Sequence, residues 1–238
     1  DSADIPPGAV LIKAAAGSDP RKLAGSIAHR VREGACPAVM AVGANSVNQA
    51  LKAVITARHY LTGEGRNICV RIAQREQSAD SIALIVEEMP PLGAFVEDVQ
   101  LKAGSSTAVP KIAGAISHKL REGSRVSVAS VGAPAVLVAT KATATARAHL
   151  RPSGCDIKVV PDFVTIELAT GTRNALRLGL LTFPTGAAGA AAAPAPALAP
   201  AAAEAPAVAA RSAPVAPYPP SGDGLGLGLA AAPASATE

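Results

Sequence analysis

Apolar residues recur in the first third of the chain with both helical and extended spacing. Leu23, Ile27 and Val31 lie four residues apart and therefore share one face of a helix that begins after Asp19 and ends at Gly34. Farther along, short apolar runs bounded by glycine-containing turns indicate strands. The pattern predicts a strand at 10–12, the helix just described, a strand at 39–42, a helix at 45–61, and strands at 68–72 and 82–86.

The chain contains this order of elements twice. Residues 12–61 and 101–150 align without a gap at an offset of 89 residues, with 22 identical pairs in 50 positions. The second copy predicts a strand near 98–103, a helix at 107–122, a strand at 125–131, a helix at 133–150, and strands near 155–168 and 175–183. A repeat of this length indicates a duplicated small domain rather than a solenoid unit.

The predicted fold class is therefore α+β, with two tandem β-α-β-α-β-β domains at residues 9–89 and 98–183, each a sheet with two helices on one face. The linker, residues 90–97, is short and begins with two prolines. We therefore expect the copies to lie side by side as an intramolecular pseudo-dimer, or to form a homo-oligomer. Residues 184–238 are mostly Ala, Pro and Gly, which predicts a disordered tail and argues against a membrane helix.

The positive charge is unevenly distributed. The formal net charge is +4; residues 101–183 contain 11 cations and 4 anions, a net charge of +7, whereas residues 12–89 contain 10 cations and 7 anions, a net charge of +3. A basic surface favours RNA, DNA or an acidic protein segment as partner. Two Tyr, three Phe and no Trp leave few rings for base stacking, and Phe163 is assigned to the core.

The distribution of reactive residues argues against catalysis. Cys36, Cys69 and Cys155 are too widely spaced for a zinc motif or a disulfide framework, and the simplest interpretation is an intracellular, reducing compartment. We expect the cytoplasm or nucleus, with an organelle left open because residue 1 is Asp rather than Met. We find no phosphate loop or catalytic motif, so no catalytic residue, cofactor or metal is expected.

The stretch Ala41–Arg58, with Asn48-Gln49 at its centre, is the most specific in the chain. It resembles the stage V sporulation protein S family, as does the strand at 82–87. Members of that family are similar to Alba-like proteins, small β-α-β-α-β-β dimers that bind RNA and DNA, so the resemblance implies this fold and activity for both copies. Copy one lacks the Pro-x-Phe that copy two has at 161–163, and copy two has Leu137-Val138 where Asn-Gln belongs.

The resemblance also implies which cations contact nucleic acid. In Alba-like proteins a basic loop between the first strand and the first helix meets the ligand, and free N–H groups at the helix start can add to a phosphate site. The matching residues here are Lys13, Arg21, Lys22, Lys102 and Lys111. The alternative is a solvated, charged edge with no ligand.

Further candidates come from helical spacing. Asn48 and Lys52 share a helix face at a separation of four, and Lys141 is the counterpart of Lys52. These side chains either meet a phosphate and a base or, in the case of Asn48 with Gln49, crosslink the backbone where the copies meet.

Two pairs of arginines complete the candidates. Arg71 and Arg75 follow the third strand and hairpin of copy one, as a basic arm or as a plain exposed loop. Arg58 and Arg147 follow the apolar helix face and are interpreted as structural.

The leading hypothesis is a non-catalytic nucleic-acid-binding module, with RNA favoured over DNA. It would bind mainly through phosphates, with low sequence specificity, using lysine-bearing edges that converge into one basic ridge. The alternative is a scaffold that binds acidic protein partners in a larger assembly.

Overall fold

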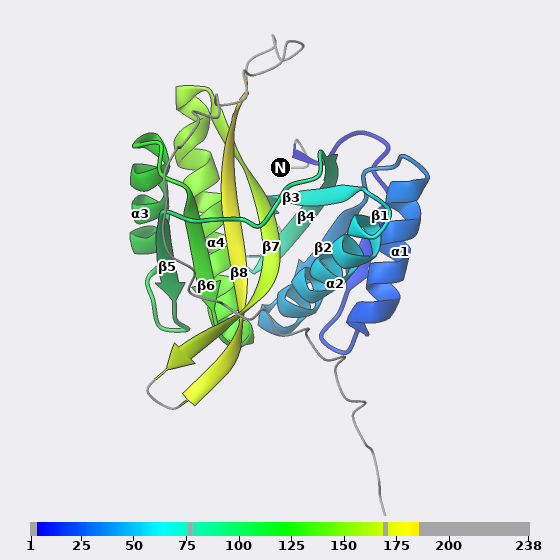
Figure 1. Cartoon of the computed structure of the whole chain (residues 1–238), viewed down its shortest axis with the longest axis horizontal. Helices are drawn as coiled ribbons and strands as arrows, with labels where there is room; N and C mark the ends of the chain where they lie inside the picture. Colours follow the sequence, from blue (N-terminus) through cyan, green and yellow to red (C-terminus); the bar gives the residue numbers. More distant parts are fainter. Residues whose placement is uncertain (1–3, 76–77, 79, 169–170, 186–238) are drawn as a thin grey trace, which may run out of the picture. The chain divides into compact units, whose positions relative to one another are not determined.

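A computed structural model describes residues 4–75, 78, 80–168 and 171–185. Copy one consists of β1 (Leu11–Ala14), α1 (Pro20–Arg32), β2 (Ala38–Val42), α2 (Ala44–Thr62), β3 (Asn67–Gln74) and β4 (Ser81–Met89). Copy two consists of β5 (Val99–Ala103), α3 (Val109–Arg121), β6 (Val126–Ser130), α4 (Ala133–Leu150), the 3₁₀ turn η2 (Arg151–Ser153), β7 (Cys155–Leu168) and β8 (Gly171–Pro184). The predicted α+β order is confirmed in both copies (Figure 1).

Strand β8 extends beyond the predicted range 175–183 at both ends. Strand β8 begins at Gly171, four residues before the predicted start, because the polar residues Thr172–Asn174 continue the ladder with β7 while their side chains stay exposed. The same strand reaches Pro184, and the backbone N–H of Thr185 donates to the carbonyl of Gly154 at 2.8 Å. The rest of the predicted tail, residues 186–238, lies outside the described residues.

The strands of both copies form one sheet in the order β1-β2-β4-β3-β7-β8-β6-β5. The copies join where β3 and β7 pair antiparallel, with Val70 opposite Val159. These two valines are separated by the repeat offset of 89 residues, so they are equivalent positions. Equivalent residues that face each other across an antiparallel pair define a two-fold contact, as in a symmetric dimer. The duplication has therefore placed a dimer-like contact within one chain.

The larger of two hydrophobic clusters lies under the helix-covered face of the sheet and includes buried residues of both copies. Ile68, Val70 and Ile72 of β3 point into it. Helix α2 packs on α1, α4 packs on α3, and α2 and α4 pack on each other. In copy two, buried Thr140 and Thr143 replace apolar residues of copy one, and their hydroxyls donate to backbone carbonyls one turn earlier, at 2.7 and 2.9 Å. These hydrogen bonds replace the bonds to water that the two hydroxyl groups lose when they are buried.

The opposite face of the sheet is covered by segments outside the helices. In copy one, Ile5 and Ala9 pack on a second apolar cluster formed by β2, β3 and β4. In copy two, the linker between β4 and β5 crosses β8 (Figure 1), and the ring of Phe95 lies directly on Gly179. The Arg177 guanidinium lies 5.8 Å from the centroid of that ring and is held by Glu97 of the linker at 3.0 Å. No described helix combines the length and apolarity needed to cross a membrane.

Substitution of Gly179 by Ala tests the linker contact. A β-carbon at this position would lie 3.0–3.1 Å from three atoms of the Phe95 ring, so the ring must move. We expect a loss of about 1–3 kcal/mol in the free energy of unfolding by urea, larger than the roughly 0.5–1 kcal/mol that replacing a strand glycine usually gains. In a Phe95→Ala background the same substitution should become neutral or stabilising. Equal losses in both backgrounds would show that the ring does not constrain this position.

Candidate nucleic-acid interface

Two arginines connect the copies beside the β3–β7 pair. Nη1 of Arg147, on α4, donates to the backbone carbonyl of Ile72 in β3 at 3.1 Å. Nη1 of Arg58, on α2, reaches the carbonyl of Pro161 in β7 at 3.5 Å. The arginines are equivalent to each other at the repeat offset, and so are the two carbonyls. Each second helix thus reaches the third strand of the other copy with the same contact, and buried carbonyls near the join gain hydrogen bonds.

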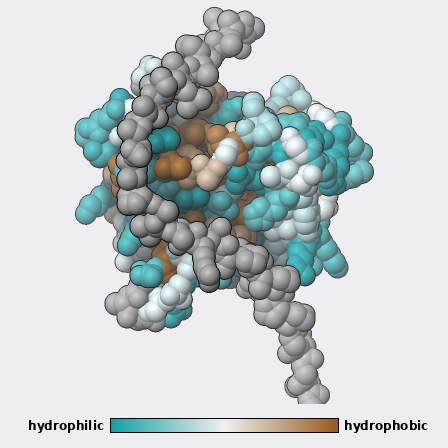
Figure 2. Space-filling view, viewed as in Figure 1, coloured by the Kyte–Doolittle hydropathy of each residue, from teal (hydrophilic) through white to brown (hydrophobic). Residues whose placement is uncertain are grey.

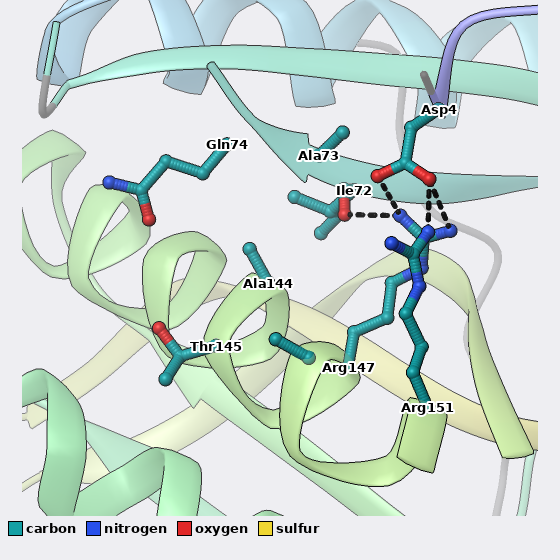
Figure 3. Close-up of a pocket in the computed structure, with 9 residues that line it drawn as sticks. Asp4, Ile72, Ala73, Gln74, Ala144, Thr145, Arg147 and Arg151 are labelled. Atoms are coloured by element: carbon teal, nitrogen blue, oxygen red, sulfur yellow. Dashed lines mark hydrogen bonds and ion pairs between the residues drawn. The ribbon is translucent and has the colours of Figure 1, made fainter. Parts of the chain in front are cut away.

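On the copy-two side this contact is a charged network beside a cavity of about 320 Å³ (Figure 3). The Arg147 side chain is 3% exposed, and its Nη2 donates to Oδ2 of buried Asp156 at 2.7 Å. Asp4 accepts from both Arg147 and Arg151. Burial is the largest influence and would lower the pKa of Arg147, but the hydrogen bonds and charges of Asp156 and Asp4 together outweigh it, so that the pKa is raised. The arginine charge is therefore neutralised by two carboxylates, which makes the contact structural.

The copy-one side carries less charge. Nε of Arg58 donates to Oδ1 of Asn67 at 2.8 Å, and Asn67 occupies the position of Asp156 in copy two. The nearest carboxylate is that of Asp162, 3.9 Å away. Burial lowers the pKa of Arg58, partly offset by the charge of Asp162. Two residues equivalent by repetition thus make the same cross-copy contact with different electrostatics.

Two of the predicted binding residues are paired with carboxylates. Lys141 is half-buried, and its Nζ pairs with Oδ1 of Asp80 at 3.0 Å, joining α4 to copy one. Arg71 is also half-buried and pairs with Glu87, which in turn holds Lys158 at 3.0 Å. Arg71 is neutralised from the neighbouring strand β4, and Lys141 by a carboxylate of the other copy. The sequence did not predict these pairings, which depend on strand register and on the join between the copies, and a role in nucleic-acid contact for the two cations stays a prediction.

The remaining cations form two separate groups rather than one ridge. The copy-one edge comprises Lys13, Arg21 and Lys22; the copy-two edge comprises Lys102 and Lys111. All five are exposed, and none is in an ion pair with a described residue. Because β1 and β5 are the two outermost strands of the sheet, the prediction of a continuous ridge was wrong. Hydrophilic residues lie on both sides of the view in Figure 2, with hydrophobic residues in the middle.

The copy-one edge continues into a cavity of about 400 Å³. Lys13 and Arg75 both line it, together with Ser46 from the first turn of α2 and Ser81 from the start of β4. Arg75 makes no ion pair with a described residue. Two of the residues predicted from the sequence, Lys13 and Arg75, thus line the same cavity. The sequence analysis missed the two serines. They come together only because β2 and β4 pair in the register that places Val42 opposite Ser81.

Asn48 and Lys52 lie half-buried on α2, and Lys52 has no carboxylate partner among the described residues. The neighbouring Gln49 donates from Nε2 to the carbonyl of Ala16 at 3.5 Å, which ties α2 to the loop before α1. That contact is within copy one, not between the copies. A role in nucleic-acid contact for Asn48 and Lys52 stays a prediction. The aromatic Phe163 is 44% exposed rather than buried, so its assignment to the core was wrong.

Comparison with protein families adds one finding. The family model described as Stage V sporulation protein S (SpoVS) matches the chain twice, over residues 10–84 and 99–182. The two matches together cover well over half of the 238 residues. Each match corresponds to one copy of the β-α-β-α-β-β unit.

Replacing Arg147 by Met should destabilise the protein more than the equivalent Arg58→Met. Loss of Arg147 leaves the buried Asp156 without its cation, which typically costs about 3–5 kcal/mol. Loss of Arg58 leaves a neutral amide and a partly exposed carboxylate, which we expect to cost about 1–2 kcal/mol. Urea unfolding measures both. Adding Asp156→Asn to Arg147→Met, which copies the residue of copy one, should restore part of the loss; no restoration would contradict the electrostatic explanation.

Acid should weaken the same network through Asp4. Burial alone would raise the pKa of this carboxyl group, but the hydrogen bond from Arg151 and the charge of Arg147 lower it below 3.8 overall. A carboxyl group with a lowered folded-state pKa stabilises the protein above its unfolded pKa, and this contribution is lost as the pH falls through the folded value. We expect Asp4→Asn to be less stable than the parent at pH 7, with the difference shrinking towards pH 2. A constant difference across that range would show that Asp4 contributes no charge-dependent stability.

Proposed function

Because the chain belongs to the stage V sporulation protein S family, we propose that it is a non-catalytic protein that binds the phosphate backbone of RNA or DNA through its two basic edges. The observation that carries the proposal is the pair of exposed, unneutralised cation groups at the two outer strands of the sheet. One carboxylate lies close by: Asp19 caps α1 by accepting from the N–H of Arg21 at 2.8 Å. The copy-one edge therefore keeps a net positive charge.

The separation of the edges suits a duplex. The sheet order places seven inter-strand steps between β1 and β5. At about 4.8 Å a step this gives about 34 Å along the sheet, shortened by twist. One turn of B-form duplex is about 34–36 Å long. The two edges would thus contact phosphates roughly one helical turn apart.

The scarcity of exposed rings supports contact with phosphates rather than with bases. Among the described residues the exposed aromatic side chains are Tyr60 and Phe163, which belong to different copies. A platform for single strands places several rings in a row. Lysine and arginine contacts to phosphate carry little sequence information, and each one releases counterions, so the affinity depends on salt.

Fluorescence anisotropy with labelled duplexes from 50 to 200 mM salt tests the proposal. If all five edge cations contact phosphates, the log–log slope should be about −4.5 and the affinity should fall about 500-fold over this range. The triple variant Lys13→Ala/Arg21→Ala/Lys22→Ala should reduce the slope by about 2.7, and Lys102→Ala/Lys111→Ala by about 1.8. RNA and DNA duplexes tested in parallel establish which of the two is preferred.

The control variant is Lys119→Ala, which removes a cation that Glu122 already neutralises at 2.8 Å and should leave the slope unchanged. Duplexes much shorter than one turn should reach one edge only, so the parent protein should then resemble the single-edge variants. A slope near zero, or equal effects of the control and edge variants, would overturn the proposal. Equally tight binding of poly-glutamate would point instead to an acidic protein partner.

A further inference from the structure

The cavity beside the copy-one edge lies at the end of the sheet where β1 and β2, which run parallel, both finish. Helix α2 starts immediately after β2. Its N-cap is Gly43, with φ of 82° and no side chain to cap the helix. The first backbone N–H groups of a helix have no partner within the helix, and they favour an anion. Lys13 and Arg75 line the same cavity and bring two positive charges to it.

Two serines that are more than nine-tenths buried give an independent sign of a ligand. Ser46 is 7% exposed and Ser81 is 2% exposed, and both line the cavity. Neither hydroxyl has a hydrogen-bond partner in the part of the chain that the structure describes. The two hydroxyls are not among the fully buried unpartnered atoms, so they keep access to the cavity and can donate to a molecule that lies in it. A ligand with several acceptor oxygens would satisfy both.

We propose that this cavity binds the terminal phosphate group of a nucleic-acid strand. This inference rests on the proposed nucleic-acid binding and names a second, distinct mode for copy one. A terminal phosphomonoester carries a charge of about −1.5 to −2 near neutral pH, which matches the two cations, and three oxygens that can accept from the hydroxyls and the helix start. Met40 and Val42 supply an apolar wall, against which the last nucleoside can pack.

Copy two lacks this cavity chemistry although it keeps the fold. The repeat offset and the strand register place Ala135, Val164 and Ala175 at the positions of Ser46, Arg75 and Ser81. Pro134 replaces Asn45 and thereby removes one of the backbone donors at the start of α4. Only Lys102 remains of the four side chains that would hold the phosphate. Copy two therefore serves as an internal control within the same protein.

The experiment compares one 12-nucleotide strand, annealed to its complement, in three forms: with a 5′ phosphate, with a 3′ phosphate and with hydroxyls at both ends. Anisotropy at constant salt gives the ratio of affinities. Charge-assisted hydrogen bonds predict about 10- to 100-fold tighter binding of at least one phosphorylated form. A ratio near one for both forms, with binding retained, would overturn this inference and leave the proposed function standing. Absence of binding by all three forms would overturn the proposed function as well.

Variants that copy the residues of copy two identify the cavity. Ser46→Ala/Ser81→Ala should bring the phosphate-dependent ratio close to one, while the affinity for the unphosphorylated duplex changes little. Arg75→Val should also bring the ratio close to one. Lys102→Ala should weaken the binding of all three forms of the duplex and leave the ratio of their affinities unchanged. If the ratio survives both cavity variants, the phosphate binds elsewhere and the assignment fails. If AMP binds as tightly as the phosphorylated duplex, the ligand is a free nucleotide and the strand-end assignment is wrong.

Discussion

The antiparallel contact between β3 and β7 determines how everything else in the protein is arranged. It places equivalent residues, Val70 and Val159, opposite each other, and so imposes a two-fold relation on two copies that are no longer identical. Beside it, Arg58 and Arg147 each hydrogen-bond a carbonyl of the other copy. Because the pair lies in the middle of the sheet, it sends β1 and β5 to opposite ends, and with them the exposed cations.

The join also shows how a duplicated domain can diverge without losing its symmetry. Copy one combines Arg58 with a neutral amide, whereas copy two combines Arg147 with the buried carboxylate of Asp156 and with Asp4. A buried ion pair adds little net stability but makes the loss of either partner severe. The same arginine position therefore has buried or half-buried carboxylate partners in copy two and a neutral amide partner in copy one. The cavity at the start of α2 shows the opposite difference, because here copy one has the polar side chains, Lys13, Ser46, Arg75 and Ser81.

The net charge of each copy does not show where cations without a carboxylate partner lie. Copy two has the larger net charge, yet Lys141, Lys158, Arg147 and Arg177 all contact carboxylates. Several of those carboxylates come from copy one or from the linker, so the basic excess of one copy is partly neutralised by the other. Five exposed cations without a carboxylate partner among the described residues lie near the first strand and first helix of the two copies. The positive charge exposed on the surface therefore depends on the contacts between the two copies as well as on the sequence of each copy.

The sequence by itself determined the elements, their order and the duplication, because helical and strand periodicities and the 89-residue offset are local properties of the chain. It also identified the structural arginines and five exposed cations. Only the tertiary structure decided that Arg71 and Lys141 are neutralised, that Phe163 is exposed, that the basic edges lie apart, and that Ser46 and Ser81 share a cavity with Lys13. Those outcomes depend on strand register and on the pairing of β3 with β7. Both bring together residues far apart in the chain, and no local pattern encodes such contacts.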